Sequence, residues 1–170
     1  MHLLSTSKLA DEIVADRVST REKAAYFVML QVLVIALGYA AGFSPPQNLW
    51  MYVYEGLVVC VVTFAGAGRV VSSYGRPLDT AFFEATYLLS VPLLVTTTVA
   101  AWVAMYGGSW LFSTMIPHVS ATSAESADAL SYWLGRLWWG YTFIVAVVIT
   151  IVFWVRLAHH VGYVASKRVA

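Results

Sequence analysis

Apolar residues gather in four long runs that short polar segments separate. The runs cover residues 24–42, 49–68, 81–106 and 132–157. Each is long enough to cross about 30 Å of hydrocarbon as an α-helix, which needs roughly 20 residues. None shows the alternation of a barrel strand, and a backbone in lipid must satisfy its own hydrogen bonds. The pattern therefore predicts an all-α chain that folds as an integral membrane four-helix bundle.

The chain divides into a short N-terminal segment, residues 1–23, and a transmembrane domain, residues 24–170. Apolar residues of the first segment recur at helical spacing opposite charged ones: Leu9, Ile13, Val14 and Val18. This spacing predicts a cytoplasmic amphipathic helix that lies on the inner membrane surface or against a partner, or else a solvated helical extension. Ser19 and Glu22 fit a capping box, so we expect the next helix to start afresh there.

Lys and Arg residues indicate the orientation of the chain. They precede the first run, separate the second from the third, and lie at or beyond the end of the fourth: Lys8, Arg17, Arg21, Lys23, Arg69, Arg76, Arg156, Lys167 and Arg168. The other two connections contain neither residue. Because basic loops stay on the cytoplasmic side, both termini should be cytoplasmic. A multi-pass protein of a cell membrane, such as the bacterial inner membrane, fits this bias.

Prolines and hydroxyl residues shape the runs. Pro45 and Pro46 lack N–H donors, so the first two helices should meet in a tight turn and form a hairpin. Pro92 predicts a kink in the third helix. Hydroxyl residues surround it: Ser90, Thr96, Thr97 and Thr98. They either support close helix packing or line a hydrated path through the kink.

Glu55 and Arg136 are charged residues that we expect at similar depths in the membrane. Glu55 lies about six residues, or roughly 9 Å, inside the outer boundary of the second run, and Arg136 about four residues inside that of the fourth. They could pair within the bundle, where each would remove the desolvation penalty of the other. Alternatively, Arg136 extends outward among tryptophans while Glu55 stays protonated or bonds a tyrosine. A third interpretation places Glu55 in a water-filled proton or cation path.

Two explanations fit the presence of Glu84 at the start of the third helix. It could pair with Arg69 or Arg76, which lie near the same membrane boundary. A carboxylate in the first turn of a helix is also favoured by the helix dipole, so a structural role suffices.

Composition agrees with the membrane assignment and narrows the chemistry. The chain is 60% hydrophobic and only 11% charged, more apolar than a soluble domain of this size could bury. A net charge of +1 without a basic patch outside the membrane flanks gives no reason to expect a nucleic-acid partner. A single cysteine, Cys60, allows no intramolecular disulfide. We expect no catalytic residues, no cofactor and no metal site.

These patterns favour a non-catalytic subunit of a membrane complex. Its partners would be the lipid bilayer, other membrane-protein subunits or further copies of itself, with small-residue faces such as the Gly38 and Gly42 pair as contacts. The alternative is an oligomeric ion channel or small transporter with a cation path near Glu55, lined by Ser90, Thr97 and Thr98. An enzyme that acts on lipid has less support, because one carboxylate without a second acid, nucleophile or metal cluster lacks the groups that an active site needs.

Overall fold

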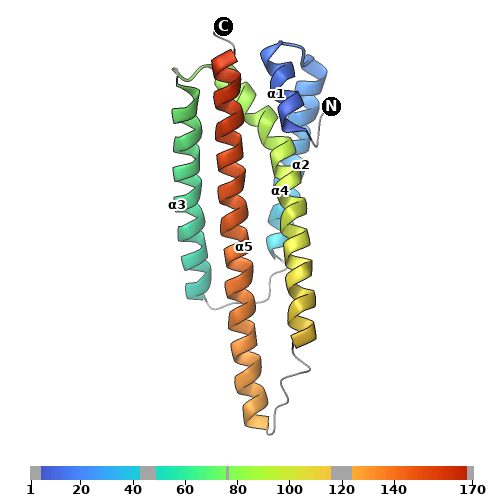
Figure 1. Cartoon of the computed structure of the whole chain (residues 1–170), viewed down its shortest axis with the longest axis vertical. Helices are drawn as coiled ribbons and strands as arrows, with labels where there is room; N and C mark the ends of the chain where they lie inside the picture. Colours follow the sequence, from blue (N-terminus) through green and yellow to red (C-terminus); the bar gives the residue numbers. More distant parts are fainter. Residues whose placement is uncertain (1–4, 43–48, 76, 116–123, 168–170) are drawn as a thin grey trace.

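The computed structural model describes the backbone of residues 5–42, 49–75, 77–115 and 124–167, and their side chains except at 31, 34–42, 49–52, 115 and 124–131. The described residues form five helices and no strand: α1 (Thr6–Val14), α2 (Thr20–Gly42), α3 (Leu49–Tyr74), α4 (Thr80–Met115) and α5 (Ala124–Lys167) (Figure 1). The prediction of an all-α chain is confirmed. Three helical stretches are long and apolar enough to cross a membrane: Val53–Tyr74, Thr80–Thr114 and Tyr132–Lys167.

Local hydrogen bonds fix where α2 and α4 begin. At α2, the Ser19 N–H donates to Glu22 Oε2 over 3.1 Å, and the Glu22 N–H donates to Ser19 Oγ over 3.3 Å. The predicted capping box is therefore confirmed. At α4, the Asp79 carboxylate accepts from the Tyr74 hydroxyl over 2.7 Å and from the Phe82 N–H over 2.8 Å. These hydrogen bonds lower the pKa of Asp79 below its ordinary value of 3.8, and the bond from Tyr74 has the larger effect.

Helix α5 is the central element of the arrangement. It packs against α3 on one side and α4 on the other, and α4 in turn packs against α2. Figure 1 shows α3 and α4 on opposite sides of α5, with α2 beside α4. In the described part of the chain, α2 and α3 are not a packed pair, although we expected them to form a hairpin. The helices instead follow the order α3–α5–α4–α2, and the last contact that would close a four-helix bundle is missing among the described residues.

Glycines let α5 approach its two neighbours closely. A Cβ atom at Gly66 of α3 would overlap the root of the Trp154 side chain on α5. A Cβ atom at Gly108 of α4 would overlap the ring of Tyr141, whose hydroxyl donates a hydrogen bond to the Ala104 carbonyl. Small residues at such contacts bring helix backbones together, which drives helix association in lipid.

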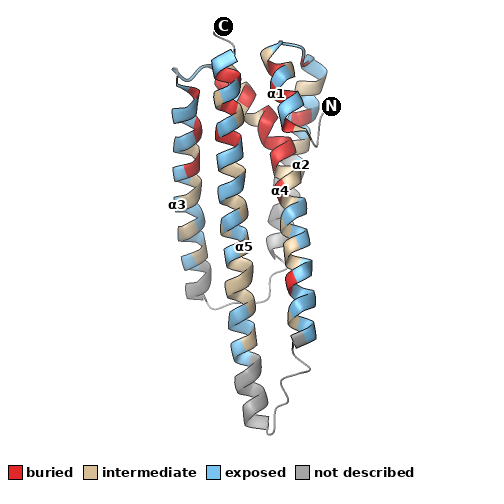
Figure 2. Ribbon diagram, viewed as in Figure 1, coloured by how far each residue is buried: buried red, intermediate tan, exposed pale blue. Residues whose placement is uncertain are grey.

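The buried core lies at one end of the molecule. Figure 2 shows buried residues gathered at the end where both termini lie, and mostly exposed or half-buried residues along the rest of α3, α4 and α5. The core residues come from the ends of all five helices, for example Tyr26, Val70, Leu88 and Val161. Large apolar side chains farther along remain exposed, which suits helices whose solvent is lipid rather than water.

Helix α1 packs on the chain's own helices. Leu9, Ala10 and Ile13 are each at most 2% exposed and belong to the core, and α1 contacts α4 and α5. On its other side, Asp11 accepts a 2.7 Å hydrogen bond from the Tyr163 hydroxyl of α5. The predicted amphipathic helix is present, but its apolar face covers this end of the chain itself rather than remaining solvated.

Helices α4 and α5 are longer than their apolar runs. With 36 and 44 residues, they measure about 54 and 66 Å at 1.5 Å per residue. Both lengths exceed the roughly 30 Å of hydrocarbon in a bilayer. Residues 107–115 lie beyond the third apolar run, yet α4 continues through them to Met115. The rings of Phe112 and Trp138, 5.3 Å apart, join the two helices in this region.

Candidate functional site

One ion pair joins α2 and α4 near the start of α4. Lys23 Nζ lies 2.6 Å from Glu84 Oε1, and both side chains are about three-quarters buried. The hydrogen bond to the carboxylate raises the pKa of Lys23 above its ordinary value of 10.5. We expected that Glu84 could pair with Arg69 or Arg76. In the structure it pairs with Lys23 instead of Arg69. Arg76 lies outside the described residues. One turn deeper, the rings of Phe27 and Tyr87 meet edge to face, 6.4 Å apart.

Below this ion pair, an open groove of about 480 Å³ lies between α2, α4 and α5. Its lining surface is entirely apolar, with aromatic residues from all three helices: Phe27, Phe83, Tyr87, Phe153 and Trp154. Thr86 also lines it, and the Thr86 Oγ1 is enclosed without a hydrogen-bond partner in the described part of the chain. The groove can therefore accept an apolar ligand.

Glu55 and Arg136 are not joined in this structure. Glu55 is half-buried on α3, whereas Arg136 is exposed on α5 with its guanidinium carbon 4.8 Å from the centre of the Tyr132 ring. Among the described residues, no ion pair links the two side chains. A cation over an aromatic face is a favourable position near a membrane boundary, so this arrangement resembles the outward-extending interpretation. Their pairing within the membrane remains a prediction.

The hydroxyl residues of α4 bond within their own helix. Ser90 and Thr97 are buried, and their hydroxyls donate to the Tyr87 and Leu93 carbonyls, each over 2.7 Å. Thr98 is half-buried. Because a hydroxyl that donates to its own helix has one fewer hydrogen bond to offer, these residues make a weak lining for a hydrated path within one chain.

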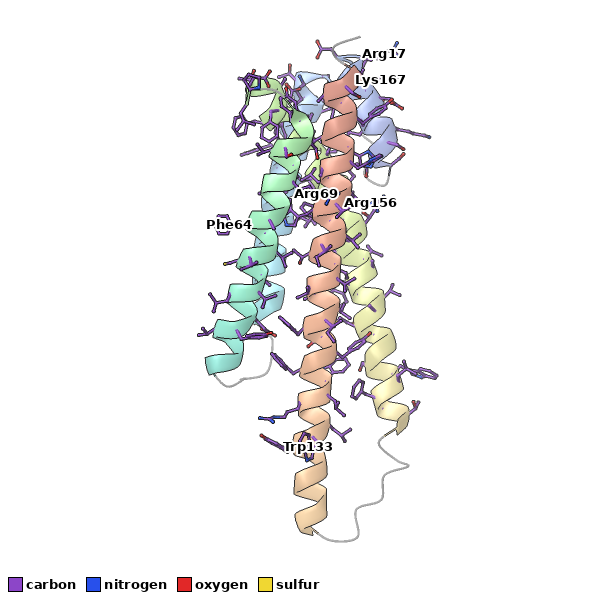
Figure 3. The ribbon with its side chains drawn as sticks, turned by 60° about the vertical axis from the view of Figure 1, so that its left-hand side comes forward. Arg17, Phe64, Arg69, Trp133, Arg156 and Lys167 are labelled. Carbon is purple, nitrogen blue, oxygen red and sulfur yellow. The ribbon has the colours of Figure 1, made fainter. Side chains whose placement is uncertain are left out.

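An exposed apolar face runs along α3. Leu57, Val61 and Phe64 recur at helical spacing and are 62%, 67% and 79% exposed. Gly56 and Gly68 lie near them, with no atom of another element within 4 Å of a Cβ added there. Figure 3 shows Phe64 extending away from the rest of the molecule. Gly38 and Gly42, the other candidate contact pair, lie in a part of α2 whose side chains are not among the described ones.

Residues that could hold a metal are scattered in the described ranges. There, no group of three or more His, Cys, Asp or Glu side chains is close enough to bind an ion. The adjacent His159 and His160 rings, with centres 5.4 Å apart, have no third such residue beside them in these ranges.

No family model, curated protein or solved structure matches this chain. The interpretation of its function therefore depends on its own residues.

Sequence reasoning missed three features of this site. It did not pair Lys23 with Glu84, because the two residues are far apart in the sequence and opposite charges near a membrane boundary have many potential partners. It also overlooked Gly66 and Gly108, since a glycine becomes a contact only when a large side chain faces it. No sequence pattern indicated the groove, because aromatic residues are frequent throughout the spans and do not mark one position.

Proposed function

We propose that this chain is a non-catalytic integral membrane protein that crosses a cell membrane four times and has both termini in the cytoplasm. Three long apolar helices with exposed apolar side chains support membrane insertion. Helix α2 supplies the fourth span. Figure 3 supports the orientation, because Arg17 and Lys167 lie at the end of the molecule where the chain ends, and Trp133 lies toward the opposite end.

We infer further that the protein acts as a self-associating or accessory subunit of a membrane complex. The observation that carries this proposal is the exposed apolar face of α3, a helix that packs mainly against α5 within the described chain. Phe64 extends from this face and Gly68 lies on the same face one turn farther along, so a second helix can approach closely beside the phenyl ring.

A cation path beside Glu55 is the alternative. It has less support, because Ser90 and Thr97 already donate to their own helix. If several copies do form such a path, Glu55→Gln changes ion flux and leaves the assembly intact. If the residue instead supports folding, the same substitution lowers the amount of assembled protein, and Arg136→Met in the same chain restores it.

Site-specific photo-crosslinking in native membranes tests the subunit role. A photoreactive phenylalanine analogue at position 64 should give one crosslinked protein band of defined mass. The control carries the same analogue at Val103 of α4, which is 68% exposed and belongs to a different helix face. A band at twice the chain mass indicates self-association, and another discrete mass indicates a different subunit. Equal labelling at both positions, or labelling of lipid alone, contradicts the proposal.

A further inference from the structure

The groove between α2, α4 and α5 lies directly below a pair of opposite charges. Lys23, Phe27 and Leu30 share one face of α2, at positions i, i+4 and i+7, and the last two line the groove. Lys23 forms the 2.6 Å ion pair with Glu84 at the start of α4. If α4 enters the membrane near its first turn, the ion pair lies at headgroup level and the groove lies in the hydrocarbon.

The lining of the groove favours a hydrocarbon occupant. The groove is open, has a volume of about 480 Å³ and exposes apolar atoms. A flexible acyl chain can fill such a groove from the lipid side, while the charges of Lys23 and Glu84 complement the two charges of a zwitterionic headgroup.

We propose that this groove binds one acyl chain of a phospholipid with an ethanolamine headgroup, and that Lys23 and Glu84 bind the headgroup. The Lys23 ammonium complements the lipid phosphate, and the Glu84 carboxylate complements the lipid ammonium. An ion pair without net charge gives little reason to prefer an anionic lipid. A primary ammonium can donate hydrogen bonds to Glu84, whereas the trimethylated ammonium of choline has no N–H to donate.

Thr86 supports this assignment at the depth between headgroup and acyl chain. It lies two residues beyond Glu84 along α4, in the lining of the groove, and its Oγ1 lacks a hydrogen-bond partner among the described residues. Ester carbonyls of a phospholipid lie just below the phosphate. Rotation about the Thr86 Cα–Cβ bond would give such a carbonyl a donor and satisfy the hydroxyl.

Native mass spectrometry of the full chain tests the proposal, which rests on the membrane insertion of the proposed function but not on the subunit role. Delipidated protein in mild detergent is mixed with equal amounts of phosphatidylethanolamine, phosphatidylcholine and phosphatidylglycerol. We expect one bound phosphatidylethanolamine per chain. Glu84→Gln should reduce the preference for ethanolamine over choline about tenfold, since it removes a charge-assisted hydrogen bond.

Two substitutions on α2 separate the groove from general lipid contact. Leu30→Trp adds bulk to the groove lining and should abolish retention of the lipid. Val32→Trp adds a ring at a residue that is 59% exposed and does not line the groove, so it should retain the lipid. Circular dichroism and thermal unfolding check that both variants fold. If Leu30→Trp does not, the headgroup preference of Glu84→Gln decides.

Several results would overturn the proposal. They are a folded wild-type chain that retains no lipid, equal retention of the three lipids, and unchanged binding in folded Leu30→Trp. A second copy or another polypeptide that displaces the lipid from the groove would also overturn it. A monomer that carries one ethanolamine lipid would remove the subunit role yet support the lipid site, so the two proposals fail separately.

Discussion

The contact of Gly108 with Tyr141 tests how the two longest helices pack. Substitution of Gly108 by Ala places a Cβ atom against the hydroxyl-bearing edge of the Tyr141 ring, where it overlaps Cε1. The ring must move, and its hydroxyl then loses the hydrogen bond to the Ala104 carbonyl. Gly107→Ala is the matched control, because a Cβ atom at this adjacent position of the same helix meets no other atom within 4 Å.

Three energies decide the size of the effect. Overpacking costs about 1–3 kcal/mol. The lost hydrogen bond costs about 0.5–1.5 kcal/mol. Replacement of a helical Gly by Ala gains about 0.5–1 kcal/mol, which the control also gains. We therefore expect Gly108→Ala to lower the free energy of unfolding by about 1–3 kcal/mol and Gly107→Ala to leave it equal or slightly higher.

Reversible unfolding in mixed micelles, followed by circular dichroism, measures both free energies. A Tyr141→Leu background completes the cycle, because removal of the ring leaves nothing for the added methyl group to displace, and the cost of Gly108→Ala should then fall to near zero. If the Gly108 and Gly107 variants are equally stable, or if Tyr141→Leu does not relieve the cost, the described contact between α4 and α5 is refuted.

Three further predictions concern other parts of the fold. Gly66→Ala should lower the unfolding temperature, whereas Gly68→Ala on the same helix should not, and equal values would contradict the close α3–α5 contact. Ile13→Ala should cost about 2–5 kcal/mol and expose α1 to proteolysis, whereas the exposed Lys8→Ala should do neither. Because its pKa is lowered, the Asp79 carboxylate stabilises the fold above about pH 4 and loses this effect as pH falls through that pKa. Asp79→Asn should weaken this acid sensitivity in pH-dependent unfolding, and an unchanged profile would exclude the effect.

Features that depend on neighbouring residues were predictable from the sequence. The four apolar runs correspond to α2, α3, α4 and α5, because length and hydrophobicity are properties of each segment alone. The start of α2 was also predictable, since Ser19 and Glu22 lie three residues apart and bond each other directly. Both features come from interactions within one helical segment.

Features that depend on distant residues could not be predicted. The amphipathic pattern of α1 predicts an apolar face. It does not predict that Leu9 and Ile13 on this face will lie against α4 and α5. Helix α4 continues beyond its apolar run, and there Phe112 contacts Trp138 of α5, a residue distant in the sequence. Likewise, the predicted tight turn at Pro45 and Pro46 lies outside the described residues, and a turn between two helices does not determine whether they pack together.

Native mass spectrometry of the tagged protein, extracted gently from its native membrane, tests the central claim most directly. The account predicts that the chain is recovered from the membrane fraction at a fixed ratio, either with further copies of itself or with another membrane polypeptide. A chain that is recovered only as a monomer, or from the soluble fraction, would contradict it.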